Sequence, residues 1–125
     1  MDTRSKIVTA AEAPRGVVLA AGSFDVLGVE QVRELQHIRG RHPARPLIAA
    51  VLPCPDAVLS LPGRAEMAAS LRMVDYVLIV EPAGRPDDLD GLVDRLQPAA
   101  MVRLQEKGAA RLRRLVEHVQ HGQTR

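Results

Sequence analysis

The sequence predicts one α/β domain in which a parallel sheet lies between two layers of helices. Two observations lead to this prediction. Short apolar runs of strand length alternate with segments of helical periodicity through most of the chain. The first two of these runs are continuously apolar, which is typical of strands buried on both faces of a parallel sheet. The 125 residues also suffice for one hydrophobic core but not for two ordinary domains. We therefore expect a three-layer α/β/α fold with four to five strands in residues 1–125.

Four apolar runs are the predicted strands. Pro46 precedes the second run and Pro53 stops it, as expected at strand ends. Because each strand is followed by a helical segment, consecutive strands are expected to pair in parallel. The four runs are residues 16–22 (GVVLAAG), 47–52 (LIAAVL), 76–80 (YVLIV) and 99–104 (AAMVRL).

The first two helices are predicted from apolar residues at helical spacing. Residues 28–39 form the first, and Gly40 followed by Pro43 is expected to end it. The second begins near Pro62, whose missing N–H costs nothing in a first turn. Its apolar positions continue to about Met73.

Two further helices complete the alternation. One starts at Pro86-Asp87-Asp88, where the helix dipole favours acidic groups. The other, residues 106–120, is rich in arginine. The inward face of the first of these is expected to carry Leu89, Leu92, Val93 and Leu96.

Composition excludes several classes of function. Cys54 is the single cysteine, so an internal disulfide and a multi-cysteine zinc site are ruled out. His118 and His121 have metal-ligand spacing, but no third ligand is evident and no metal site is expected. A formal charge of +2, one Phe, one Tyr and no Trp argue against a nucleic-acid partner. Without a long apolar run or a signal-like N-terminus, we expect a soluble, cytoplasmic protein with no membrane partner.

Four segments, taken in order, carry a family resemblance. They are Lys6-Ile7-Val8, residues 18–27 (VLAAGSFDVL), residues 64–77 from Arg-Ala-Glu to Val-Asp-Tyr-Val, and residues 96–103 (LQPAAMVR). Together they resemble the cytidylyltransferase-like nucleotidyltransferases, most closely the adenylyltransferase domain of bacterial heptose-phosphate kinase/adenylyltransferases. The resemblance covers about residues 6–104. It implies a Rossmann-like sheet of the nucleotidyltransferase type, with a nucleotide site beyond the carboxyl ends of the strands.

The chain departs from this family at its catalytic motif. The family's His-x-Gly-His reads Gly28-Val29-Glu30-Gln31 here. In the family, the two histidines hold the triphosphate and stabilise charge that develops at the attacked phosphorus. Gly28 has no side chain, and Gln31, at the second lost histidine position, cannot become cationic. Glu30 adds a negative charge where a phosphate would approach. We therefore assign no catalytic residue.

The remaining family features are only partly present. The family's Lys-Gly-Gly after the fourth strand reads Arg103-Leu104-Gln105, which keeps a cation and loses the glycines. Its Ser-Thr-Thr segment and its last strand have no counterpart, so a second chain is one conceivable source of that strand. The candidate phosphate-binding residues are Gly22, Ser23, Phe24, Asp25, Gln31, Arg64 and Arg103.

Each candidate also has a structural interpretation. Residues 22–25 would be a tight strand-to-helix turn with Asp25 as a cap, and Arg64 and Arg103 would be solvated. Asp75 is expected to be structural, and Cys54 to be an inert loop thiol with no cation nearby.

Three functions are compatible with the sequence. The preferred hypothesis is a degenerate nucleotidyltransferase-fold protein that binds a nucleotide or sugar phosphate, with catalysis lost or weak. The second is an active enzyme that moves AMP or CMP from ATP or CTP, with Mg²⁺, onto a sugar or polyol phosphate. The third is a non-catalytic interaction module, such as a homodimer.

Overall fold

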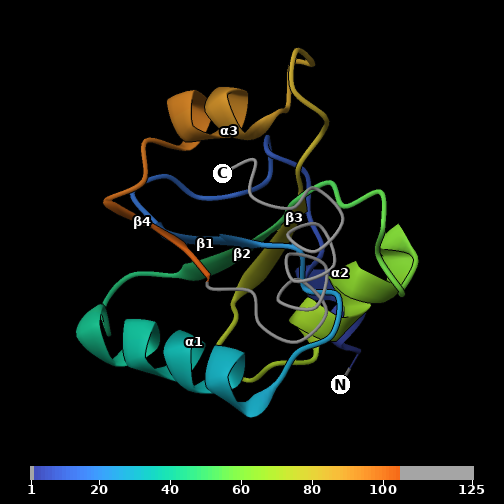
Figure 1. Ribbon diagram of the computed structural model, residues 1–125. Coiled ribbons are helices and arrows are strands. Elements are labelled where there is room, and N and C mark those ends of the chain that lie inside the picture. The colour runs from blue at the N-terminus through green and yellow to red at the C-terminus, as the bar shows by residue number, and fades with distance from the viewer. Residues whose placement is uncertain (1, 105–125) are drawn as a thin grey trace, which may run out of the picture.

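A four-stranded parallel sheet forms the centre of the molecule. The computed structural model describes residues 2–104 (Figure 1). The strands lie in the order β3-β2-β1-β4, and every neighbouring pair is parallel. The α/β fold class predicted from the sequence is therefore confirmed. The strands are β1 (Val18–Gly22), β2 (Leu47–Val51), β3 (Tyr76–Ile79) and β4 (Ala100–Arg103).

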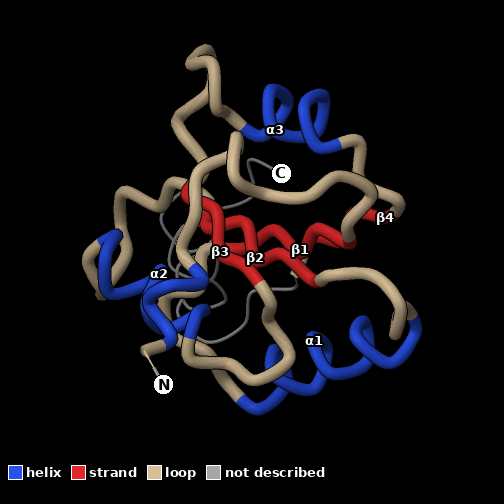
Figure 2. The backbone as a smooth tube through the Cα atoms, turned by 180° about the vertical axis from the view of Figure 1, so that it is seen from behind, coloured by secondary structure: helices blue, strands red, loops and turns tan. Residues whose placement is uncertain are grey.

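Helices cover both faces of this sheet, as Figures 1 and 2 show from opposite sides. Helices α1 (Val29–Arg41) and α2 (Leu61–Ala69) lie on one face, and α3 (Leu89–Leu96) lies on the other. Every residue of β1 and β2 is buried, which explains their continuously apolar sequence. The first face packs Leu35, Ile38, Ala65 and Ala68 against the sheet, and the second packs Leu92 and Leu96.

The order of the strands fixes where a ligand site is expected. The chain runs from β1 outward through β2 to β3, and then crosses back to place β4 on the other side of β1. The direction of winding thus reverses beside β1. In open parallel sheets, ligands bind beyond the carboxyl ends of the strands near such a reversal.

The expected ends of α1 and α2 were wrong. Helix α1 continues through Gly40 to Arg41, and the N–H of His42 closes it on the carbonyl of Arg39. Gly40 is helical, and the helix ends before Pro43, which disfavours helical geometry in the residue that precedes it. Helix α2 ends at Ala69. The N–H of Ser70 is shared between the carbonyls of Glu66 and Met67, which tightens the last turn toward a 3₁₀ geometry.

Helix α3 also begins later than expected, at Leu89 rather than at Pro86. Asp88 is its N-cap, and the carboxylate accepts hydrogen bonds from the N–H of Gly91 at 2.8 Å and of Gly84 at 2.9 Å. These two N–H groups, Gly91 first, lower the pKa of Asp88 from its ordinary value of 3.8. Residues 86–88 therefore belong to the turn. The predicted inward face of α3 is confirmed, because its four apolar residues pack in one cluster.

The N-terminal residues protect one edge of the sheet. After a 3₁₀-helix, η1 (Thr3–Lys6), Ile7 forms a parallel bridge with Val77 of β3. The N–H of Val8 donates to the carbonyl of Val77 at 3.0 Å. No described residue pairs with the outer edge of β4. The helix predicted for residues 106–120 lies outside the described residues. Within residues 2–104, no helix has both the length and the apolar character needed to cross a bilayer.

Candidate functional site

The loop after β1 is held in an uncommon conformation. Phe24 has a φ of 53°, in the left-handed region that bulky residues rarely adopt, and its side chain is only 2% exposed. The ring packs in the cluster under α1 and α2, and this burial holds the backbone in place. Gly22 allows the chain to pass close to Leu104, since a Cβ at Gly22 would lie 3.2 Å from Leu104 Cδ1. Core packing thus determines the shape of this loop.

Asp25 joins this loop to the segment before α2. Its Oδ2 accepts a hydrogen bond from the N–H of Val58 and its Oδ1 one from the N–H of Leu59, both at 2.8 Å. The carboxylate is therefore turned toward protein N–H groups of another loop rather than toward a cap in its own loop. Asp25 is 6% exposed. Its expected part in binding a phosphate remains a prediction, and its structural part is to tie two loops together.

Gln31 is part of the first turn of α1. Its Oε1 accepts a hydrogen bond from the N–H of Gly28 at 2.8 Å, in a capping arrangement at the helix N-terminus. Only 6% of Gln31 is exposed. Glu30, in the same turn, is exposed where the helix dipole favours a carboxylate. At the two lost histidine positions the chain thus has a glycine and an amide whose oxygen caps a helix.

Arg64 is a buried cation at the carboxyl edge of the sheet. It is 5% exposed, and its Nη1 donates to the carbonyl of Ser23 at 3.1 Å and to that of Leu52 at 2.8 Å. No carboxylate of residues 2–104 forms an ion pair with it, and its Nε is buried without a hydrogen-bond partner. A buried charge without a counterion costs several kcal/mol. Arg64 is therefore not the solvated helix residue of the structural interpretation.

Arg64 lines a cavity of about 270 Å³ between the ends of β2 and β3. The lining of this cavity is otherwise mostly apolar, with Glu81 as its one carboxylate. A second cavity of about 280 Å³ adjoins the first and shares Pro53, Val80 and Glu81 with it. Arg103 lines this second cavity, together with Asp88 and Asp90. The first cavity is lined by Pro53, Cys54, Pro55, Leu61, Arg64, Ile79, Val80, Glu81 and Pro82.

The structure brings some predicted site residues together and leaves others apart. The carbonyl of Ser23 meets the guanidinium of Arg64, so the loop after β1 and helix α2 join at this edge. Arg103 lies at the same edge but in the adjacent cavity, and it is exposed. Gln31 lines neither cavity.

Two residues of the cavity were not recognised from the sequence. Cys54 was expected to have no cation nearby, yet it shares the cavity with Arg64. Glu81 was not considered at all. Its position directly after the third apolar run was the available signal, because the carboxyl ends of parallel strands share one edge. In the described part of the chain, no three His, Cys, Asp or Glu side chains are grouped to hold a metal ion.

The comparisons with known proteins identify the fold. No protein-family model and no curated protein matches the chain. Among solved structures, the chain is similar to one described as the lipopolysaccharide core biosynthesis protein from Thermoplasma volcanium GSS1, with a TM-score of 0.58. The alignment covers 82% of this chain and 87% of that one, at 18% identity. The chain therefore shares the parallel α/β fold of that structure.

Proposed function

We propose that the carboxyl edge of the sheet binds the phosphate group of a nucleotide or sugar phosphate, and that nucleotidyl transfer is lost or weak. Buried Arg64 carries this proposal. Its guanidinium is held by two backbone carbonyls rather than by a carboxylate, so its charge is not neutralised by the described residues. An incoming anion would supply the missing counterion and accept from the donors that remain.

The position and neighbours of Arg64 support a phosphate ligand. The cavity lies at the edge where parallel α/β sheets bind their ligands. Guanidinium forks match the geometry of phosphate oxygens and bind them bidentately. The similar structure, that of a lipopolysaccharide core biosynthesis protein, agrees with a ligand of the sugar-phosphate class.

The replaced histidines support the loss of transfer activity. A transferase needs cationic or strongly donating groups where charge develops at phosphorus, and losing one such group costs about 10²–10³ in rate. Gly28 offers no side chain for this task. The Oε1 of Gln31 is engaged with the N–H of Gly28, and an amide remains neutral at any pH. Binding without efficient turnover is the expected result.

Calorimetric titration with a sugar phosphate, ATP, CTP and the Mg²⁺ complexes of both nucleotides tests binding. We expect saturable heat and a higher melting temperature with at least one of these ligands. Arg64→Lys keeps the charge but loses the fork, so affinity should fall by roughly tenfold. Arg33→Gln, which removes an exposed arginine of helix α1 that lines neither cavity, is the matched control and should bind normally.

Cys54 provides a local readout for the same experiment. Because it lines the Arg64 cavity and is the only cysteine, its alkylation rate reports occupancy of that cavity. We expect a bound ligand to slow alkylation in the wild-type chain, and to do so less in Arg64→Lys. Absence of heat, of a melting shift and of Cys54 protection at millimolar ligand contradicts the proposal.

Pyrophosphate release tests the enzyme alternative, with Mg²⁺-ATP or Mg²⁺-CTP as donor and a sugar or polyol phosphate as acceptor. In that case Gln31, Arg64 and Arg103 would make the phosphate contacts. Release that disappears in the double variant Gln31→Ala/Arg64→Ala would establish an active transferase. Release at full rate in that variant would place any activity elsewhere.

Exposed valines near the site favour a homodimer as a second candidate. Val26 is 57% exposed, Val29 64% and Val58 75%. Val26 and Val58 lie in the two loops that Asp25 joins. Gel filtration with light scattering would detect a dimer, and Val58→Asp should shift it to monomer if this surface forms the contact.

A further inference from the structure

A cavity at the opposite edge of the sheet gathers three cations. It has a volume of about 420 Å³, and Lys6, Arg39 and Arg45 line it beside Asp75 and Tyr76. Asp75 directly precedes β3 and Tyr76 opens it, so this is the amino edge of the sheet. The Arg64 cavity lies at the carboxyl edge. The two cavities share no lining residue.

Backbone carbonyls hold the three cations in place. The Nζ of Lys6 donates to the carbonyl of Leu71 at 3.1 Å. The Nη1 of Arg45 donates to the carbonyl of Gly16 at 2.7 Å. The Nη1 of Arg39 donates to the carbonyl of Arg45 at 2.7 Å. Carbonyls position a cation without cancelling its charge, so the groups are already ordered before a ligand arrives.

Asp75 is the one carboxylate in the cavity wall, and it is already engaged. Its Oδ2 accepts from Arg39 Nη1 and from the N–H of Leu47, both at 2.8 Å. The structural role predicted for Asp75 is confirmed by these bonds. Three cations facing one carboxylate leave an excess of two positive charges on the wall. Arg39 and Arg45 each use only Nη1, and their other guanidinium donors have no partner among residues 2–104.

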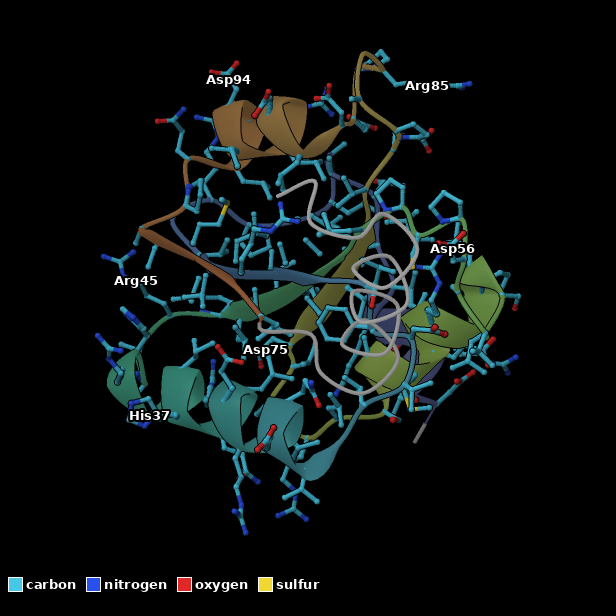
Figure 3. The ribbon with its side chains drawn as sticks, in the orientation of Figure 1. His37, Arg45, Asp56, Asp75, Arg85 and Asp94 are labelled. Atoms are coloured by element: carbon cyan, nitrogen blue, oxygen red, sulfur yellow. The ribbon has the colours of Figure 1, made fainter. Side chains whose placement is uncertain are left out.

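Tyr76 adds a neutral polar group to the same wall. It is half-buried, and its hydroxyl is able to donate a hydrogen bond to an oxyanion. Figure 3 labels Arg45 and Asp75, which come from the loop before β2 and the residue before β3. Lys6, Arg39 and Arg45, which are distant in sequence, thus supply positive charge to one cavity.

We propose that this amino-edge cavity is a second anion site, which binds a compact dianion, a phosphate group either free or as a small monoester. Two guanidinium forks and an ammonium offer more donors than one carboxylate ligand would use, whereas a phosphate has three or four oxygens to accept them. The excess of two positive charges matches the charge of the dianion. The site is independent of the function proposed for the carboxyl edge.

Tyr76 makes the test specific to this cavity. The chain has one Tyr and no Trp, so its tyrosine fluorescence reports the amino edge alone. Inorganic phosphate is titrated at ionic strength held constant with sodium chloride, to separate binding from screening. We expect a saturable change in Tyr76 emission. A parallel titration with glycerol 3-phosphate distinguishes the two sources, since a larger response to it would mean that the cavity also accepts the ester.

Variants at the wall test the assignment. Lys6→Gln/Arg45→Gln should weaken phosphate binding at least tenfold, because charge-assisted hydrogen bonds are lost. Arg45→Lys keeps the charge and should retain part of the affinity. Arg85→Gln is the matched control: Arg85 projects from the loop before α3 (Figure 3), and its removal should change nothing. Thermal melts of each variant verify that it is folded.

The outcomes separate the two sites. Phosphate binding read by Tyr76 should persist in Arg64→Lys, and protection of Cys54 should persist in Arg45→Gln. The inference is overturned by a flat Tyr76 signal up to about 50 mM phosphate, where a millimolar site is nearly full. It is equally overturned if the double variant, shown to be folded, binds phosphate as tightly as the wild-type chain.

Discussion

Arg64 and Asp25 are opposite charges buried at the same edge of the sheet, and each is held by backbone groups. Arg64 donates to two carbonyls, and Asp25 accepts from two N–H groups. Both residues therefore act as connectors between loops. Arg64 joins the loops after β1 and β2, and Asp25 joins the first of these to the segment before α2. This arrangement orders the rim of the candidate site without neutralising the Arg64 charge.

Removing the Asp25 carboxylate should destabilise the chain. Asp25→Ala leaves the N–H groups of Val58 and Leu59 without their acceptors, which should cost about 2–4 kcal/mol of unfolding free energy. Asp25→Asn keeps one acceptor oxygen and should cost less. Urea unfolding measures both. Asp94→Ala, at an exposed site on α3 (Figure 3), is the control and should change stability by less than about 0.5 kcal/mol. Equal effects of Asp25→Ala and Asp94→Ala would contradict the connecting role.

The roles of single residues were the hardest to predict from the sequence. Asp25 finds its partners 33 and 34 positions away, and Arg64 reaches back 41 positions to Ser23. Local patterns contain no information on such contacts. The sequence therefore indicated the carboxyl edge of the sheet as the candidate region, but not that Arg64 is buried, nor that Cys54 and Glu81 share its cavity.

At the scale of elements, local signals predicted which segments are helices and strands better than where they end. The four strands lie within one or two residues of their predicted bounds. The signal is strongest for β1 and β2, because burial of every residue leaves a continuous apolar pattern. The end of a helix depends on which nearby residue caps it, and the energy differences between alternative caps are small. Gly40 continues α1, and Asp88 caps α3, which was expected to start at Pro86.

Two glycines should respond oppositely to the same substitution. Gly40→Ala adds a methyl group at an exposed position of helix α1 where no atom lies within 4 Å, so it should stabilise the chain by about 0.5–1 kcal/mol. Gly22→Ala places a methyl group 3.2 Å from Leu104 Cδ1 at the buried end of β1, so it should destabilise by about 1–3 kcal/mol. Thermal unfolding of the pair measures the contrast. A stabilised Gly22→Ala would show that Leu104 moves freely.

The cap of α3 should make stability depend on pH. Because hydrogen bonds hold the folded-state pKa of Asp88 below 3.8, its contribution is present above that value. It is lost as the pH falls through the lowered folded-state pKa. Asp88→Asn cannot titrate, so the difference in melting temperature between wild type and variant should shrink on acidification below pH 3.8. A difference that stays constant from neutral to acidic pH would exclude this role.

At the scale of the whole molecule, protection from hydrogen exchange should follow the order of strands. β1 and β2 are wholly buried and have a strand on each side, whereas β4 pairs only with β1 among described residues and alternates between half-buried and exposed positions. We expect amides of β1 and β2 to exchange slowest and those of β4 faster, measured by mass spectrometry of peptides. Equal protection of β4 and β1 would show that β4 is covered in solution.

The topology itself was predictable because the alternation of strands and helices admits few arrangements of a parallel sheet. What sequence order did not indicate is that the two edges of the sheet have different chemistry. Lys6, Arg39 and Arg45 are scattered along the chain and meet only because the amino ends of β2 and β3 are neighbours.

The covering of the β3 edge by Ile7 and Val8 affects the tendency of the chain to aggregate in solution. An open strand edge is a surface on which other molecules can add strands, and Ile7 and Val8 cover that edge of β3. Proteolytic trimming of these residues would leave the fold's centre intact and uncover the edge. The trimmed protein would then be prone to assemble into β-rich aggregates. Ile7 and Val8 are therefore expected to protect the chain from self-association.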